Sequence, residues 1–93
     1  MKPIYFIDTE TYNKIEAIIE TFEYYKKCYN DTATQCYVTE NMYNDESDAL
    51  KDYVKKIQAH IAHANGRYYE GMKEAFDFCA VTLKNFITLY RKQ

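Results

Sequence analysis

The sequence contains few of the residues that interrupt regular secondary structure. Its 93 residues include two glycines, one proline and a single serine, Ser47, and tryptophan is missing altogether. This scarcity excludes a fold built from many tight turns and favours long regular elements. With 47% hydrophobic residues the chain can form a core, which argues against intrinsic disorder. The length predicts a single helical domain spanning residues 1–93.

Targeting and membrane signals are also missing. No apolar run approaches the roughly 18 residues that a membrane span needs. The start, Met1-Lys2-Pro3, leads into only four apolar residues before Asp8, which is too short for a secretory signal. We therefore expect a cytoplasmic protein that makes no membrane contact. Cys28, Cys36 and Cys79 are then expected to be reduced thiols, with a Cys28–Cys36 bridge as the alternative.

Motifs for catalysis or metal binding are scarce, since no Walker loop, Cys-x-x-Cys pair or nucleophile elbow occurs. The run Phe6-Ile7-Asp8-Thr9-Glu10-Thr11 resembles the first motif of the DEDD-type 3′–5′ exonucleases, in which the two carboxylates hold metal ions. The later motifs of that family have no counterpart here. We interpret Asp8 as a helix cap and Glu10 as a first-turn carboxylate. His60 and His63 permit two metal ligands without a third. We expect no enzyme activity, metal or cofactor.

Hydrophobic periodicity predicts a mainly α fold. A first helix is expected over residues 9–29, ended by Asn30-Asp31-Thr32. Two short segments, residues 4–7 and 35–39, are β-prone. Pairing between them is one option, although two strands this short are marginal without a helix beneath them. The apolar side of the first helix comprises Tyr12, Ile15, Ile18, Ile19, Phe22, Tyr25 and Tyr29.

A second apolar stripe extends over the C-terminal half with a mean step of about 3.6 residues, the period of an α-helix. It passes through Asn65-Gly66, a typical helix stop. A break there predicts a three-helix bundle with helices at about 9–29, 46–65 and 67–91, which we prefer because the helix lengths then match. The alternative is a continuous second and third helix in an elongated dimer. The stripe comprises Leu50, Val54, Ile57, Ile61, Ala64, Tyr68, Met72, Ala75, Cys79, Leu83, Phe86 and Tyr90.

The last predicted helix is apolar around most of its circumference, which is typical of a helix that is covered on several sides. Two neighbouring helices cover only part of such a surface. We therefore predict a two-fold homodimer that involves Phe78, Val81 and Leu89. The alternative is a monomer in which this helix is central.

Charge is divided unequally along the chain. Residues 1–49 contain four basic and ten acidic side chains, whereas residues 50–93 contain eight basic and four acidic ones. We expect complementary faces within one fold or between protomers, with an anionic partner for the basic half as the alternative.

The eleven tyrosines favour protein–protein contact, because tyrosine provides a large contact area and tolerates water at its hydroxyl. The predicted function is a non-enzymatic protein-interaction module, such as a virus- or mobile-element-encoded inhibitor that occludes a host nucleic-acid or defence enzyme. The first alternative is a nucleotide or nucleic-acid binder, and the second is a structural subunit of a larger assembly. The candidate protein-binding residues are Tyr43, Asp45, Glu46 and Asp48; the candidate nucleotide-binding or nucleic-acid-binding residues are Lys51, Lys55, His63, Arg67, Tyr68 and Tyr69.

Overall fold

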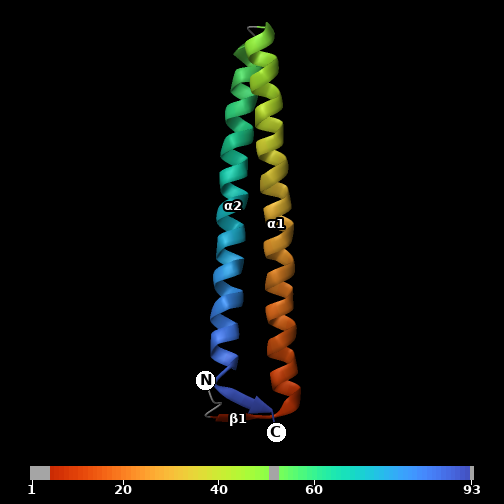
Figure 1. Cartoon of the computed structure of the whole chain (residues 1–93), viewed down its shortest axis with the longest axis vertical. Helices are drawn as coiled ribbons and strands as arrows, with labels where there is room; N and C mark the ends of the chain where they lie inside the picture. Colours follow the sequence, from red (N-terminus) through yellow and green to blue (C-terminus); the bar gives the residue numbers. More distant parts are fainter. Residues whose placement is uncertain (1–4, 51–52, 93) are drawn as a thin grey trace. The chain divides into compact units, whose positions relative to one another are not determined.

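The computed structural model of the chain describes residues 5–50 and 53–92 and is mainly helical (Figure 1). Its elements are β1 (Tyr5–Ile7), α1 (Thr9–Leu50), α2 (Tyr53–Ile87) and β2 (Tyr90–Lys92). The predicted helical class is confirmed. The three-helix bundle is wrong, because two long helices take the place of the three shorter ones.

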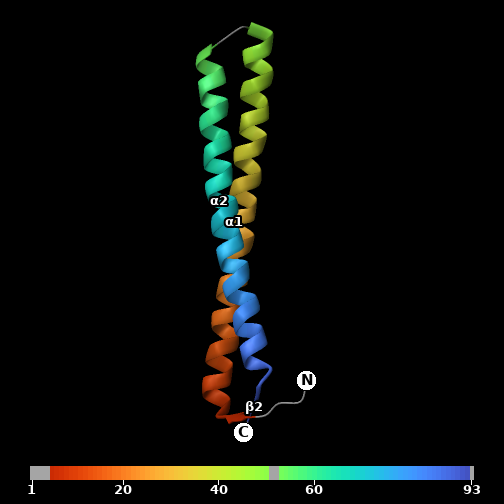
Figure 2. The ribbon, with the colours of Figure 1, turned by 90° about the vertical axis from the view of Figure 1, so that its left-hand side faces the viewer.

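The chain forms two compact units, and each helix contributes one segment to each unit. Unit 1 comprises residues 1–26 and 74–93, and unit 2 comprises residues 27–73. In both views the two helical segments of unit 2 lie side by side (Figures 1 and 2). Within each unit, residues later on α1 contact residues earlier on α2, so the segments are antiparallel. Glu23 pairs with Lys84 and Lys26 with Asp77 in unit 1, and Glu40 pairs with His63 and Glu46 with Lys55 in unit 2.

The strands of unit 1 form a parallel pair in which Tyr5 lies opposite Tyr90. The Tyr5 amide also donates to the Leu89 carbonyl at 2.9 Å, and the rings of Tyr5 and Tyr90 lie 5.5 Å apart. The predicted strand 4–7 is thus confirmed over Tyr5–Ile7, but its partner is β2 and not residues 35–39.

The last helix ends at Ile87, earlier than the expected residue 91. The Leu89 amide donates to the Phe86 carbonyl at 3.1 Å, and the Thr88 hydroxyl donates to the Asn85 carbonyl at 2.7 Å. These bonds use carbonyls that a helix end leaves open, and the chain then continues extended into β2.

The helical segments of unit 1 enclose an apolar interior. Ile19, Ala80 and Ile87 are buried, and the rings of Phe22 and Phe76 approach to 5.8 Å. The first helix therefore uses part of its predicted apolar side to pack on α2, as expected of an amphipathic helix.

In unit 2, α1 continues through the segments expected to be a turn and a strand. The hydroxyls of Thr32 and Thr34 donate to the carbonyls of Cys28 and Asn30, each at 2.9 Å, and so are satisfied within the helix. Ala33 is buried at 4% exposure. Packing on α2 thus outweighs the local turn and strand propensities of residues 30–39.

The helix α2 also continues through Asn65-Gly66, so the alternative of a continuous second and third helix is correct in this respect. Gly66 is buried beneath the ring of Tyr37, and a Cβ atom added to it would lie 2.7 Å from Cε1 of that ring. The glycine therefore permits close approach of a side chain and does not end the helix. The dimer in that alternative stays a prediction.

The face of α2 that packs on α1 in unit 2 differs from the predicted stripe. It consists largely of small residues: Ala59, Ala62 and Gly66 are buried, whereas Ile57 and Ile61 are 59% and 56% exposed. The inward positions follow alternating steps of three and four residues, the heptad spacing of paired helices. Those of unit 2 are Tyr29, Ala33, Cys36, Glu40, Tyr43 and Ser47 on α1, and Lys55, Ala59, Ala62, Gly66, Tyr69 and Lys73 on α2.

Candidate interaction surface

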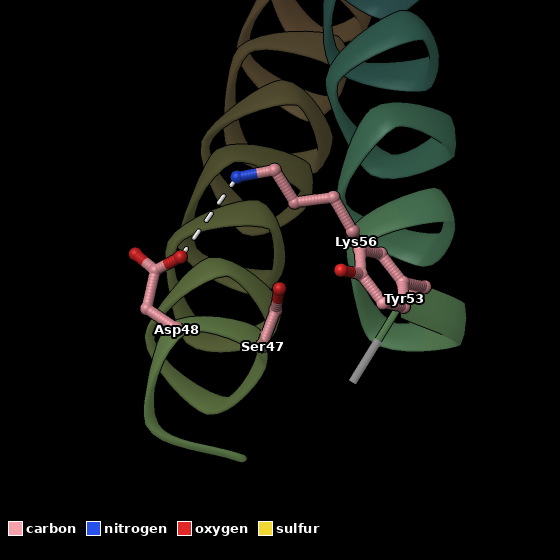
Figure 3. Close-up of a pocket in the computed structure, with 4 residues that line it drawn as sticks. All are labelled: Ser47, Asp48, Tyr53 and Lys56. Carbon is pink, nitrogen blue, oxygen red and sulfur yellow. Dashed lines mark ion pairs between the residues drawn. The ribbon is translucent and has the colours of Figure 1, made fainter. Parts of the chain in front are cut away.

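The acidic residues proposed to bind a partner lie on α1, where a polar connector was expected. Two of them form ion pairs with α2: Glu46 with Lys55 at 2.9 Å, and Asp48 with Lys56 at 3.9 Å. Figure 3 shows the second pair across a hollow that Ser47 and Tyr53 also line. Glu46 and Asp48 therefore join the two helices of unit 2.

The other two members of this acidic set differ from each other. Tyr43 is half-buried, and the Lys55 ammonium lies 5.3 Å from its ring centroid. The ring also lines a hollow between the helices together with Ile61 and Asn65. Asp45 is exposed. The four predicted residues thus share a helix but form no common outward patch.

The basic and aromatic candidates are similarly dispersed. Nδ1 of His63 lies 2.9 Å from Oε2 of Glu40, and the half-buried ring of Tyr69 stacks on Tyr29 at 6.0 Å between centroids. Lys55 is paired with Glu46 as above. Arg67 and Tyr68 are exposed, and Lys51 lies outside the described residues. Lys55, His63 and Tyr69, which were expected to contact phosphates and bases, are therefore already in contact with residues of α1.

A polar cluster that the sequence did not reveal joins the helices nearby. The Tyr37 hydroxyl donates to Oε2 of Glu70 at 2.5 Å, and this hydrogen bond, together with partial burial, raises the pKa of Tyr37 above its ordinary value. The ring lies 5.8 Å from that of His63. The only sequence signal for this cluster is Gly66, because its missing side chain makes room for the Tyr37 ring.

The expectation of complementary charged faces within the fold is confirmed. Ion pairs within each unit join the acidic first half of the sequence to the basic second half. In unit 1 these are Glu16–Lys92, Glu23–Lys84 and the reversed pair Lys26–Asp77; in unit 2 they are Glu40–His63, Glu46–Lys55 and Asp48–Lys56.

The motif that resembles an exonuclease is a helix start. Oδ2 of Asp8 accepts hydrogen bonds from the Thr11 amide and hydroxyl, each at 2.9 Å, and these hold the pKa of Asp8 below its ordinary value. Glu10 pairs with Lys14 one turn later, at 3.1 Å. Asp8 is thus the N-cap of α1, as interpreted from the sequence.

The outward side of α2 in unit 2 carries a set of uncharged residues, which we name the outer seam. Ile57, Ile61 and Tyr68 are 59%, 56% and 64% exposed. Steps of three and four residues place all members on one side of the helix. At the edge of this side, Ile61 also lines the hollow that Tyr43 and Ala62 line. The outer seam comprises Val54, Ile57, Ile61, Ala64, Tyr68 and Gly71, and every member is exposed.

The matching outward positions of α1 in unit 2 have a different composition. They include two aspartates, Asp31 and Asp45, beside Val38 and Met42. Outward positions of paired helices are ordinarily polar or charged. The outer seam departs from that pattern along six positions, from Val54 to Gly71.

The residues predicted to mediate self-association lie in unit 1. Phe78 and Val81 are 72% and 46% exposed on α2. Leu89 is half-buried, and its carbonyl accepts the hydrogen bond from Tyr5 beside the strand pair. The exposure of Phe78 and Val81 is compatible with the predicted contact, which stays a prediction, whereas Leu89 is already engaged within the unit.

Among residues 5–50 and 53–92, no three His, Cys, Asp or Glu side chains gather as ligands for a metal ion. Cys28, Cys36 and Cys79 are free thiols, so the alternative Cys28–Cys36 bridge is absent. In this described part of the chain, neither helix has a segment with the length and apolar character that a bilayer crossing requires. Comparison with protein-family models, curated proteins and solved structures finds no match to the chain.

Proposed function

We propose that the chain is a non-enzymatic protein-interaction module that binds its partner through the outer seam of α2. The observation that supports the proposal is the seam itself: an exposed set of uncharged positions that includes two isoleucines and a tyrosine. Exposed apolar patches on helices are typical of protein interfaces, and apolar and aromatic side chains provide most of the binding free energy there.

The other candidate surfaces support this choice by their contacts. Glu46, Asp48 and His63 form ion pairs within unit 2, so using any of them to bind a partner would first break a contact of the fold. The outer seam can be covered without breaking any of these pairs. In the form expected from the sequence, such a module acts by occluding a host nucleic-acid or defence enzyme.

Site-specific photocrosslinking in the cells that naturally produce the chain tests the proposal. A benzophenone amino acid at Ala64, within the seam, should give a discrete protein adduct. The same amino acid at Val38, an outward position of α1 with 55% exposure, is the control. An adduct at Ala64 but not at Val38 supports the proposal. Equal adducts at the two positions, or none at Ala64, would contradict it.

A further inference from the structure

We infer that the partner of the outer seam is a second copy of the chain, bound with its α2 antiparallel to the first. This inference rests on the proposed function, since it names the occupant of the same surface. The observations that carry it are the order of residue sizes along the seam, the absence of charge on it, and the apolar area it exposes.

The order of sizes makes the seam complementary to itself. An antiparallel pairing about a two-fold axis midway between Ile61 and Ala64 places each isoleucine at position 61 opposite the alanine of the other copy. One step outward, Ile57 lies opposite Tyr68, and beyond that Val54 lies opposite Gly71. Of these three facing pairs, two thus combine a branched side chain with alanine or glycine, which lets the side chains of the two helices interdigitate closely.

Charge does not oppose this pairing. The positions that border the seam are Gln58 and Asn65 on one side and His60 and Arg67 on the other, so no carboxylate and no lysine borders it between Ile57 and Tyr68. Residues 27–73 contain six basic and seven acidic side chains, so two copies of unit 2 are nearly neutral towards each other. A strongly charged partner helix would find no complementary charge on the seam itself.

The exposed area sets the strength expected of the dimer. Val54, Ile57, Ile61 and Tyr68 each expose roughly 100 Å² of side-chain surface, or about 800 Å² for two copies. Specific interfaces bury about 1,200–2,000 Å² in total, and smaller ones are typical of weak or transient contacts. We therefore expect a reversible, concentration-dependent dimer.

Sedimentation velocity on the purified full chain, from about 1 to about 100 μM, tests the dimer. The wild type should shift from monomer towards dimer across this range. Ile61→Glu should remove the shift, because a carboxylate would be buried without a partner. Val38→Glu, at a position of matched exposure on α1, should retain it. Circular dichroism verifies folding, and Tyr68→Lys replaces Ile61→Glu if the latter does not fold.

Cysteine crosslinking of a variant without the native cysteines tests the orientation. A cysteine at Ala64, close to the two-fold axis, should crosslink to its own copy with a short bis-maleimide. A cysteine at Gly71 should not, because the two copies of this residue would lie about 25 Å apart along the helix axes. A mixture of Gly71→Cys and Val54→Cys should crosslink. Efficient self-crosslinking at Gly71 would overturn the antiparallel arrangement.

The outcomes separate this inference from the proposed function. A wild type that stays monomeric throughout, or a Val38→Glu variant that loses the dimer as completely as Ile61→Glu, would overturn the inference. If the chain is monomeric and Ala64 still crosslinks to a different protein in cells, the interaction function stands and the second copy does not. If the chain is monomeric and the seam gives no specific adduct, both fail.

Discussion

The two glycines of α2 provide a matched test of the close approach between Tyr37 and Gly66. A Cβ atom added at Gly66 would lie 2.7 Å from Cε1 of the Tyr37 ring and 3.0 Å from Cζ, whereas one added at Gly71 meets no atom within 4 Å. Both glycines lie in the interior of the same helix. Replacing either by alanine therefore brings the same gain in helix propensity, about 1 kcal/mol.

Because the propensity gain is common to both variants, the difference between them isolates the steric effect. Gly71→Ala should raise the free energy of unfolding by about 1 kcal/mol. Overpacking in a close contact costs about 1–3 kcal/mol, so Gly66→Ala should fall below Gly71→Ala by about that amount. The Tyr37 ring cannot simply move aside, since its hydroxyl is bonded to Glu70 at 2.5 Å.

Urea unfolding followed by circular dichroism measures both variants at low protein concentration, where the proposed dimer would not contribute. The Tyr37→Ala background completes a double-mutant cycle: with the ring removed, Gly66→Ala should become as stabilising as Gly71→Ala. Equal stabilisation by the two alanines in the wild-type background would show that Tyr37 does not pack on Gly66, and would refute this explanation of why Gly66 lies inside a helix.

Three further predictions concern charged and titrating groups. The hydrogen bond to Glu70 raises the pKa of Tyr37 in the folded chain. The contribution of the Tyr37 hydroxyl to stability is therefore complete below the ordinary tyrosine pKa of about 10 and is lost as the pH rises through the folded pKa. The urea midpoint of the wild type should fall more steeply in alkali than that of Tyr37→Phe. The pKa of Asp8 is lowered in the folded chain, so the contribution of its carboxylate to stability is present above pH 3.8 and is lost as the pH falls through the folded pKa. Asp8→Ala should therefore flatten the acid limb of the helical circular dichroism signal. Glu46→Lys and Lys55→Glu should each cost no more than about 1 kcal/mol, because both side chains are partly exposed, and the double swap should recover part of that loss; additive losses in the double swap would show that the pair contributes nothing.

The helical class and the first strand were predictable because they depend on local patterns. Residues 5–7 are β-prone and flanked by Asp8, whose capping role follows from its position before a periodic segment. The continuity of α1 through residues 30–39 was not predictable from propensity. It depends on Ala33, which packs against the opposite helix, and on hydroxyls such as that of Thr32, which bond back to the preceding turn.

The candidate site was predictable only in part, for a related reason. Acidic and basic candidates such as Glu46 and Lys55 were identified separately as two alternative sites, yet they are partners in one ion pair. Spacing along a single helix cannot reveal pairs between helices, because these depend on which residues the antiparallel register brings together. The seam residues Ile57 and Ile61 belonged to the predicted apolar stripe, but the sequence does not show that these two positions are exposed in the folded chain.

The exposure of the stripe in unit 2 has a physical cause that also explains the seam. Along α2 in unit 2 the larger apolar side chains are the exposed ones: Ala59 and Ala62 are buried, whereas Ile57 and Ile61 are exposed. Small residues on the inward side leave room for side chains of the opposite helix, as the Tyr37 ring over Gly66 shows. Such an inward side removes little apolar area from water, and the larger side chains, whose burial would contribute more, remain on the outside. Within unit 2, then, ring contacts and ion pairs join the helices beside the buried alanines, and the larger apolar side chains of α2 remain exposed.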